Sequence, residues 1–138
     1  MIKKLIFLPF LFIAFISCDT ELEINNENVS GVWKADVFVS TVPGIPPEYV
    51  EAGEKEFLSS VYTLNSDNSM NMKSDYFSNG APGNWELNPE TKELSMYYTA
   101  DTINGIEKFI ITSLSKHQMI LRQDIEEMSA YVELTLKK

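Results

Sequence analysis

The sequence predicts an all-β fold, an eight-stranded antiparallel up-and-down barrel over residues 31–138. Apolar and polar residues alternate there in short runs, which is the periodicity of strands with one buried face. Turn-forming residues separate the runs at close spacing, and short turns between consecutive strands favour an antiparallel meander. Closing the meander into a barrel pairs its two edge strands, which otherwise expose free backbone groups. A β-sandwich is the alternative arrangement of the same strands.

Each expected strand is justified by its own alternation or by its β-forming residues. Trp33 and Trp85 lie in the first and fourth, and Val61-Tyr62-Thr63 favours the second, although its start is equally compatible with a helix. In the later strands, apolar residues at every second position share one face. The pattern predicts no long helix. The strands are expected at residues 31–39, 57–64, 70–73, 83–87, 94–99, 106–114, 118–123 and 129–136.

The connections between these strands follow from composition. Residues 65–68 and 88–92 contain asparagine, aspartate, serine or proline, which favour turns. Residues 100–105 are expected to form a loop. The long connection, residues 40–55, contains three prolines, too many for a central strand. We expect it to lie over one end of the barrel.

Residues 1–17 resemble the signal peptide of a bacterial lipoprotein. Two lysines precede an apolar stretch, residues 5–16, and Ser17 is the small residue before Cys18, the only cysteine of the chain. Those twelve apolar residues make about 18 Å of helix, too short for a hydrocarbon core of roughly 30 Å. We therefore expect cleavage before Cys18 and a diacylglycerol thioether on its sulfur. An ordinary secretory signal with an incidental cysteine is the alternative.

Composition limits the classes of partner. The formal net charge is −9, and an acidic surface repels phosphates, so no nucleic-acid partner is expected. The sequence has no polybasic patch for anionic lipids, so membrane attachment is expected through the lipid on Cys18. With that cysteine modified, no disulfide is left, and packing alone must stabilise the domain.

Residues 18–30 are expected to form an acidic, flexible tether, because they are polar and lack aromatic side chains. The expected location is the bacterial cell envelope, with the outer membrane, at its periplasmic face or the cell surface, favoured. The acidic run Asp19-Thr20-Glu21-Leu22-Glu23 resembles a surface-export signal. An aspartate directly after the cysteine also resembles an inner-membrane retention signal, so both membranes stay open.

Several segments together resemble the lipocalin-like domain of small Gram-negative envelope lipoproteins, over roughly residues 30–138. The resemblance implies an eight-stranded barrel, usually without an assigned activity, and it supplies no ligand-binding residues. The segments are Gly31-Val32-Trp33, Tyr62-Thr63-Leu64-Asn65-Ser66-Asp67, Gly83-Asn84-Trp85, Phe109-Ile110-Ile111 with Leu114, Met119-Ile120-Leu121 and the final strand at 131–136.

The sequence offers no catalytic set. His117 is the only histidine, with no second histidine or free cysteine to share a metal, and the HExxH and GxSxG signatures are missing. We therefore expect no enzyme, no metal and no cofactor. Asp101-Thr102-Ile103 resembles an O-glycosylation sequence of exported proteins, which makes Thr102 a candidate modification site.

Aromatic and methionine side chains are the remaining indication of function. Eight-stranded barrels are either filled by side chains or hold one small ligand, and methionine suits both. Seven side chains are expected to point inward as the candidate lining of a ligand site: Trp33, Tyr62, Met70, Met72, Trp85, Met96 and Met119. Four others are expected outside or at the rim: Tyr49, Tyr76, Phe77 and Tyr97.

Two functional hypotheses follow. The first is a non-enzymatic, lipid-anchored binding module that takes a small apolar or amphipathic ligand at the open end of its barrel. The second is an accessory module with a filled core, which binds another envelope protein through its outer face or residues 40–55.

Overall fold

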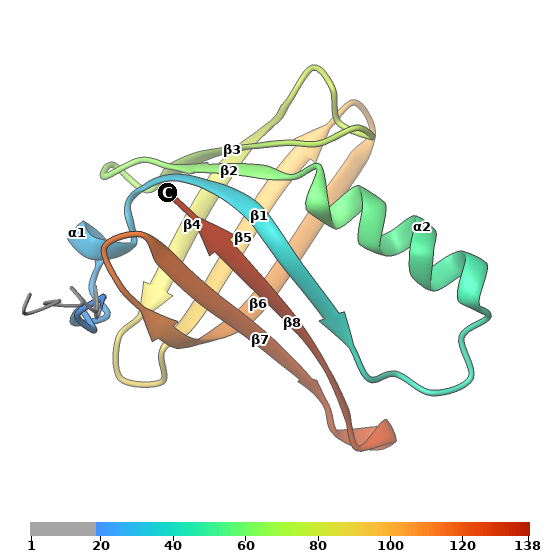
Figure 1. Ribbon diagram of the computed structural model, residues 1–138. Coiled ribbons are helices and arrows are strands. Elements are labelled where there is room, and N and C mark those ends of the chain that lie inside the picture. Colours follow the sequence, from blue (N-terminus) through green and yellow to red (C-terminus); the bar gives the residue numbers. More distant parts are fainter. Residues whose placement is uncertain (1–18) are drawn as a thin grey trace, which may run out of the picture.

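The computed structural model describes residues 19–138, and its eight strands close into an antiparallel up-and-down barrel (Figure 1). Every strand pairs with its neighbours in the chain, and the last pairs with the first, so the predicted barrel is confirmed and the sandwich is excluded. The expected signal peptide and Cys18 lie outside the described residues. The strands are β1 (Gly31–Ser40), β2 (Val61–Leu64), β3 (Ser69–Lys73), β4 (Ala81–Asn88), β5 (Glu93–Ala100), β6 (Ile103–Leu114), β7 (Gln118–Ile125) and β8 (Ala130–Lys137).

Helix α2 (Pro47–Leu58) shows that the prediction of no long helix is wrong. It occupies most of the proline-rich connection and the helix-compatible start of the expected second strand. A proline at the first helical position loses nothing, because its missing N–H has no partner within the helix. Glu48 in the first turn and Lys55 in the last complement the helix dipole. The prolines that exclude a strand therefore also begin a helix.

Residues 19–30 of the expected flexible tether are ordered in the structure, and their second half contains the short helix α1 (Asn26–Val29). The Asn25 side chain accepts a hydrogen bond from the Asn28 N–H at 2.9 Å, which caps this helix. Val29 is fully buried, and its carbonyl accepts a hydrogen bond from Trp33 Nε1 at 2.8 Å. The tether prediction is therefore wrong for this part, because burial of an apolar side chain offsets the entropy of ordering it.

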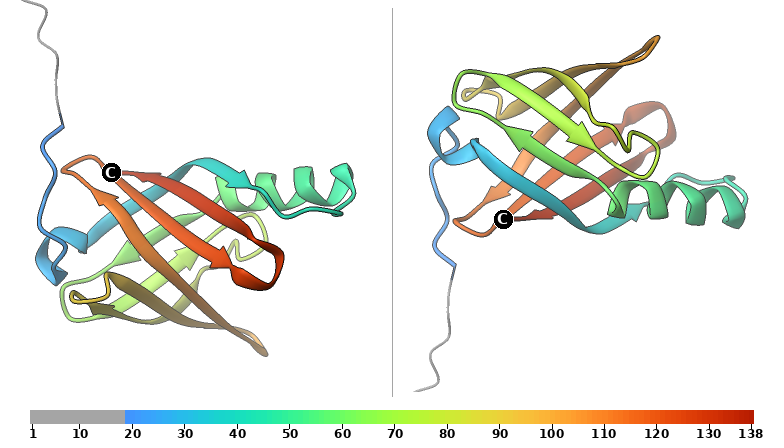
Figure 2. Two further views of the ribbon diagram at one scale, coloured as in Figure 1. Left: turned by 90° about the horizontal axis from the view of Figure 1, so that it is seen from below. Right: turned by 90° about the horizontal axis from the view of Figure 1, so that it is seen from above.

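The first half of the same segment lies against the turn between β6 and β7. The Leu22 N–H donates to the Leu114 carbonyl at 2.8 Å, and Glu21 forms a bridge with Ser115. The Ser115 hydroxyl also donates to the Asp19 carboxylate at 2.6 Å. The N-terminal segment thus covers one end of the barrel, while α2 lies at the opposite end (Figure 2).

Burial differs between the two ends. Inward side chains near α1, such as Leu64, Trp85 and Leu114, are almost fully buried. Inward side chains toward α2, such as Phe38 and Tyr98, are only partly buried. The packed core therefore fills the α1 half of the barrel, and the α2 half is the more open one.

The connection between β5 and β6 is shorter than the expected loop. Ala100 pairs with Ile103, so Asp101 and Thr102 alone form a two-residue hairpin turn. Asp101 takes the left-handed conformation, with φ of 53°, which aspartate tolerates. Thr102 is exposed in this turn. Within the described residues, no helix is both long and apolar enough to cross a membrane.

Candidate functional site

The α2 half of the barrel contains a cavity of about 300 Å³. Its walls come from the C-terminal part of α2, from β2, β3, β5 and β6, and from the loop between β3 and β4. Most of the lining is apolar or aromatic, with two carboxylate side chains. The lining residues are Glu56, Phe57, Ser60, Tyr62, Met72, Tyr76, Phe77, Tyr98 and Glu107.

Glu107 is the polar centre of this cavity. Strand alternation places it on the same inward face of β6 as Phe109 and Ile111, both of which are buried. Its Oε1 accepts a hydrogen bond from the Tyr98 hydroxyl at 2.9 Å, and its Oε2 accepts one from the Tyr62 hydroxyl at 3.3 Å. Two tyrosines from different strands therefore hold one carboxyl group inside the barrel.

Gly105 makes room for this arrangement. It pairs directly with Tyr98 across the β5–β6 ladder. A Cβ atom on Gly105 would lie against the Tyr98 ring, 2.7 Å from its hydroxyl oxygen. The phenol ring therefore lies over the bare backbone of Gly105, and from there its hydroxyl reaches Glu107.

The surroundings shift the pKa values of all three groups. Burial raises the pKa of Glu107, and the hydrogen bonds from Tyr98 and Tyr62 offset part of that rise. Burial and the nearby Glu107 carboxylate also raise the pKa values of Tyr62 and Tyr98 above the ordinary value of tyrosine. Both hydroxyls therefore keep their protons at neutral pH and act as donors.

The substitution Glu107→Gln is expected to change how stability depends on pH. Because the folded-state pKa of Glu107 is raised, its contribution to stability is fully present below the unfolded-state pKa and is lost as the pH rises through the folded-state value. The variant should therefore gain stability relative to the wild type as the pH rises from the unfolded-state pKa, about 4, through the raised folded-state pKa of Glu107. Urea unfolding across this range measures the difference. Glu86→Gln, on the exposed outer face of β4, controls for the loss of one carboxylate, and parallel profiles for Glu107→Gln and the wild type would contradict the assignment.

The rim of the cavity connects α2 to the loop between β3 and β4. The Glu56 carboxylate accepts a hydrogen bond from the Ser74 hydroxyl and another from the Tyr76 N–H at 3.2 Å. Phe77 meets Tyr98 edge to face, with ring centroids 5.8 Å apart. The rim aromatics are thus positioned by polar contacts that begin on the helix.

A single aromatic contact joins α2 to the first strand. Phe57 stacks on Phe38 with ring centroids 4.8 Å apart. None of the twelve residues of α2 is itself buried. The helix therefore projects from the barrel and contributes mainly its C-terminal part to the cavity (Figures 1 and 2).

All seven side chains predicted to line a ligand site are buried, but only Tyr62 and Met72 reach the cavity. The other five do not line it, and the core is packed closely enough around them to leave each at most 3% exposed. These five are Trp33, Met70, Trp85, Met96 and Met119.

The sequence interpretation missed Glu107, Tyr98, Glu56 and Phe57 as site residues. A signal for Glu107 was present, because it shares the inward alternation of Phe109 and a carboxylate at such a position is unusual. No comparable signal marks Glu56 and Phe57, since both belong to the unexpected helix. Of the four predicted outer or rim aromatics, Tyr49 and Tyr76 are exposed, and Phe77 and Tyr97 are partly buried.

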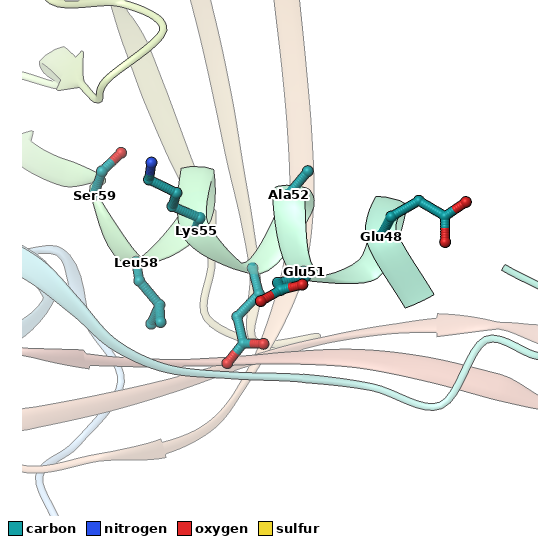
Figure 3. Close-up of a pocket in the computed structure, with 7 residues that line it drawn as sticks. Glu48, Glu51, Ala52, Lys55, Leu58 and Ser59 are labelled. Atoms are coloured by element: carbon teal, nitrogen blue, oxygen red, sulfur yellow. The ribbon is translucent and has the colours of Figure 1, made fainter. Parts of the chain in front are cut away.

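A wider hollow of about 780 Å³ runs along the outer side of α2 (Figure 3). Every residue that lines it belongs to α2 or to its C-cap Ser59, and no second element closes it. Glu48, Glu51 and Lys55 dominate its lining, and their side chains point in different directions along the helix. This hollow is therefore an open surface, and the cavity around Glu107, which several strands and α2 line together, is the candidate site.

The other candidate residues lie away from this cavity. His117 is exposed in the turn between β6 and β7, at the opposite end of the barrel. Thr102 lies near the cavity end but faces solvent. Within residues 19–138, no three histidine, cysteine or carboxylate side chains gather closely enough to hold a metal ion.

No protein-family model, no curated protein and no solved structure matches this chain. The lipocalin-like identity therefore stays a prediction from the sequence motifs.

Proposed function

We propose that this protein is a lipid-anchored, lipocalin-like lipoprotein of the bacterial cell envelope that binds a small amphipathic ligand. The observation that carries the proposal is the cavity at the α2 end, where aromatic walls surround the Tyr62–Glu107–Tyr98 group. An apolar pocket with a few convergent polar groups is the usual composition of a ligand site. Its volume of about 300 Å³ lies at the lower end of the range for such sites.

The size of the cavity sets the size of the ligand. At about 30 Å³ per water molecule, the cavity corresponds to roughly ten non-hydrogen atoms. The filled α1 half of the barrel supports the site as a rigid base, since Met72 and Tyr62 connect the cavity to the packed core. The ligand is therefore a small molecule, shorter than a full lipid chain, and the proposed role is binding without catalysis.

The proposed anchor agrees with the direction in which the cavity opens. Cys18 directly precedes Asp19, whose carboxylate contacts Ser115 at the α1 end of the barrel. Attachment there leaves the cavity at the opposite end, away from the bilayer. A ligand from the aqueous side of the envelope then has free access to the site.

The anchor is testable by mass. The protein extracted from its host membranes is expected to begin at Cys18 and to carry a diacylglycerol group, because the thiol follows the signal-like segment directly. Intact-mass spectrometry measures both, and a hexose-containing addition located at Thr102 would support the glycosylation site. An unmodified Cys18, or a different first residue, would contradict the lipoprotein proposal.

The substitution Met72→Trp is expected to abolish ligand binding. Met72 points inward from β3 and lines the cavity, so the larger indole would occupy the space of the ligand. Saturation-transfer NMR with small amphipathic molecules measures binding. Lys73→Trp is the matched control, because Lys73 is the next residue of the same strand and faces solvent. Equal binding by the two variants would place the ligand elsewhere.

A protein-interaction module is the second candidate function. The observation that favours it is a second apolar hollow, of about 200 Å³, between α2 and the strands β1 and β8, beside the exposed side chains of Ile45 and Tyr49. If the protein is an interaction module of this kind, the wild type is expected to bind no small molecule. An envelope protein would instead co-purify with it, and the substitution Tyr49→Ser would reduce that association.

A further inference from the structure

The charged groups that line the cavity are all of one sign. Glu107 lies at its centre and Glu56 at its rim, and the lining contains no lysine, arginine or histidine. The whole chain carries a formal charge of −9, which adds to the negative potential. An anionic ligand would therefore enter against like charge, with no basic side chain to receive it.

Five aromatic rings surround the same space. They are arranged partly at right angles, since Tyr76 and Phe77 meet edge to face at 4.9 Å and Phe77 meets Tyr98 in the same way at 5.8 Å. Ring faces carry negative electrostatic potential and attract ammonium groups, most strongly where water is excluded. The five rings belong to Phe57, Tyr62, Tyr76, Phe77 and Tyr98.

The carboxyl group of Glu107 keeps acceptor capacity for a ligand. Each of its oxygens accepts one tyrosine hydroxyl, from Tyr98 and from Tyr62. An ionised carboxylate offers about four lone-pair sites, so about two are left for further donors. The tyrosines therefore orient the carboxylate and leave room for the N–H groups of a bound ammonium.

From these observations we propose that the ligand is a small organic cation, a primary amine or ammonium with an apolar body, whose charged nitrogen pairs with Glu107 inside the aromatic cage. This inference rests on the proposed ligand-binding function and names the chemical class of the ligand. The aromatic walls take the apolar body, and Glu107 takes the charge. Glu56 at the rim adds attraction on entry, while its own oxygens stay engaged by Ser74 and Tyr76.

Binding of such a cation is coupled to the protonation of Glu107. The groups that face Glu107 are Tyr62 on β2, Tyr98 on β5 and the rim carboxylate Glu56 on α2. The cation pairs with the ionised form, so affinity is expected to fall as the pH drops below the raised pKa of Glu107. A neutral ligand of the same shape has no such dependence.

The experiment compares three probes of the same shape: phenethylamine, phenethyl alcohol and phenylacetate. The full-length protein, as a bacterial host processes it, is held in lipid nanodiscs and titrated by calorimetry near neutral pH, with empty nanodiscs as the blank. A charge-assisted hydrogen bond in the cavity predicts that the amine binds about ten- to a hundredfold more tightly than the alcohol, with phenylacetate weakest.

Two variants assign the effect to Glu107. Glu107→Gln keeps the shape and one acceptor oxygen for a tyrosine hydroxyl, while its NH2 group can only donate to the other hydroxyl. It removes the charge, so it should lose the preference for the amine and retain binding of the alcohol. Glu86→Gln removes a carboxylate from the exposed outer face and should keep the preference. If Glu107→Gln does not fold, the wild-type protein still tests the assignment to Glu107. The order of affinity of the three probes, and the loss of the preference for the amine at acid pH, then provide the test.

The outcomes distinguish failure of the cationic ligand class from failure of the binding function itself. If the alcohol or the acid binds the wild type as tightly as the amine, the cationic ligand is ruled out while the binding function stands. If none of the three probes binds, the binding function is overturned and this inference with it. If the preference for the amine survives in Glu107→Gln, another group binds the ammonium and the assignment to Glu107 is wrong.

Discussion

Replacing Trp33 with alanine is expected to lower the free energy of unfolding by about 4 kcal/mol. The Trp33 ring is completely buried, and its Nε1 donates a hydrogen bond to the Val29 carbonyl at 2.8 Å. The Lys138 ammonium lies 4.7 Å from the ring centroid on the same side of the barrel as α1. The substitution would leave a cavity, an unpaired carbonyl and a loosened N-terminal segment at once. Such a loss is a large share of the roughly 5–15 kcal/mol that stabilises a domain.

Urea or thermal unfolding followed by circular dichroism measures this loss. The substitution Trp33→Phe should cost less, because it keeps most of the apolar volume and removes only the hydrogen bond. The control is Tyr49→Ala, which truncates an aromatic side chain that is 68% exposed and should change stability by no more than about 0.5 kcal/mol. A Trp33→Ala variant as stable as this control would mean that the N-terminal segment does not close the barrel.

The substitution Gly83→Ala is expected to destabilise the barrel by about 3 kcal/mol or more. Gly83 pairs with Tyr98 across the β4–β5 ladder. A Cβ atom at this position would lie against the Tyr97 carbonyl oxygen and 2.7 Å from the Tyr98 Cα. Both neighbours are backbone atoms, so no side-chain rotation relieves the overlap and the two strands must separate. The same movement would displace Tyr98 from Glu107 and weaken the candidate site.

Gly53→Ala provides a matched control with the opposite expected sign. Gly53 lies within α2, and a Cβ atom there meets nothing within 4 Å. Alanine has the higher helix propensity, so this variant should gain roughly 0.5–1 kcal/mol. Unfolding curves of the two variants, measured under the same conditions, give the loss of stability that is due to the close contact between β4 and β5. Equal stability of both variants would contradict the contact between β4 and β5.

The barrel itself was predictable because its pattern is local. Strand alternation depends on neighbouring residues alone, and it placed Trp33, Met72 and Leu121 on inward faces that the structure confirms. The same alternation extends from Phe109 to Glu107, although the sequence interpretation did not single out Glu107. The short turns at residues 65–68 and 88–92 follow from composition in the same way.

Helix α2 and the N-terminal segment were not predictable from the same pattern. The prolines before Tyr49 exclude a strand, and composition alone does not distinguish a loop from a helix that begins at a proline. The N-terminal segment is polar, and its order depends on Val29 and Leu22 reaching a barrel end formed by distant residues. Apolar side chains that are sparse in sequence gain burial only once that end exists.

By itself, the sequence determined the antiparallel strand order and the inward direction of many core side chains, because both are local patterns of residues. The lipoprotein-like start at Cys18 stays a prediction. Only the tertiary structure decided which part of the interior is filled. Trp33 and Trp85 are fully buried in the packed core, while Tyr62, Tyr98 and Glu107 meet around a cavity. The reason is physical: alternation sets the direction of a side chain, whereas the position of a cavity depends on how side chains from several strands and one helix fill a shared volume.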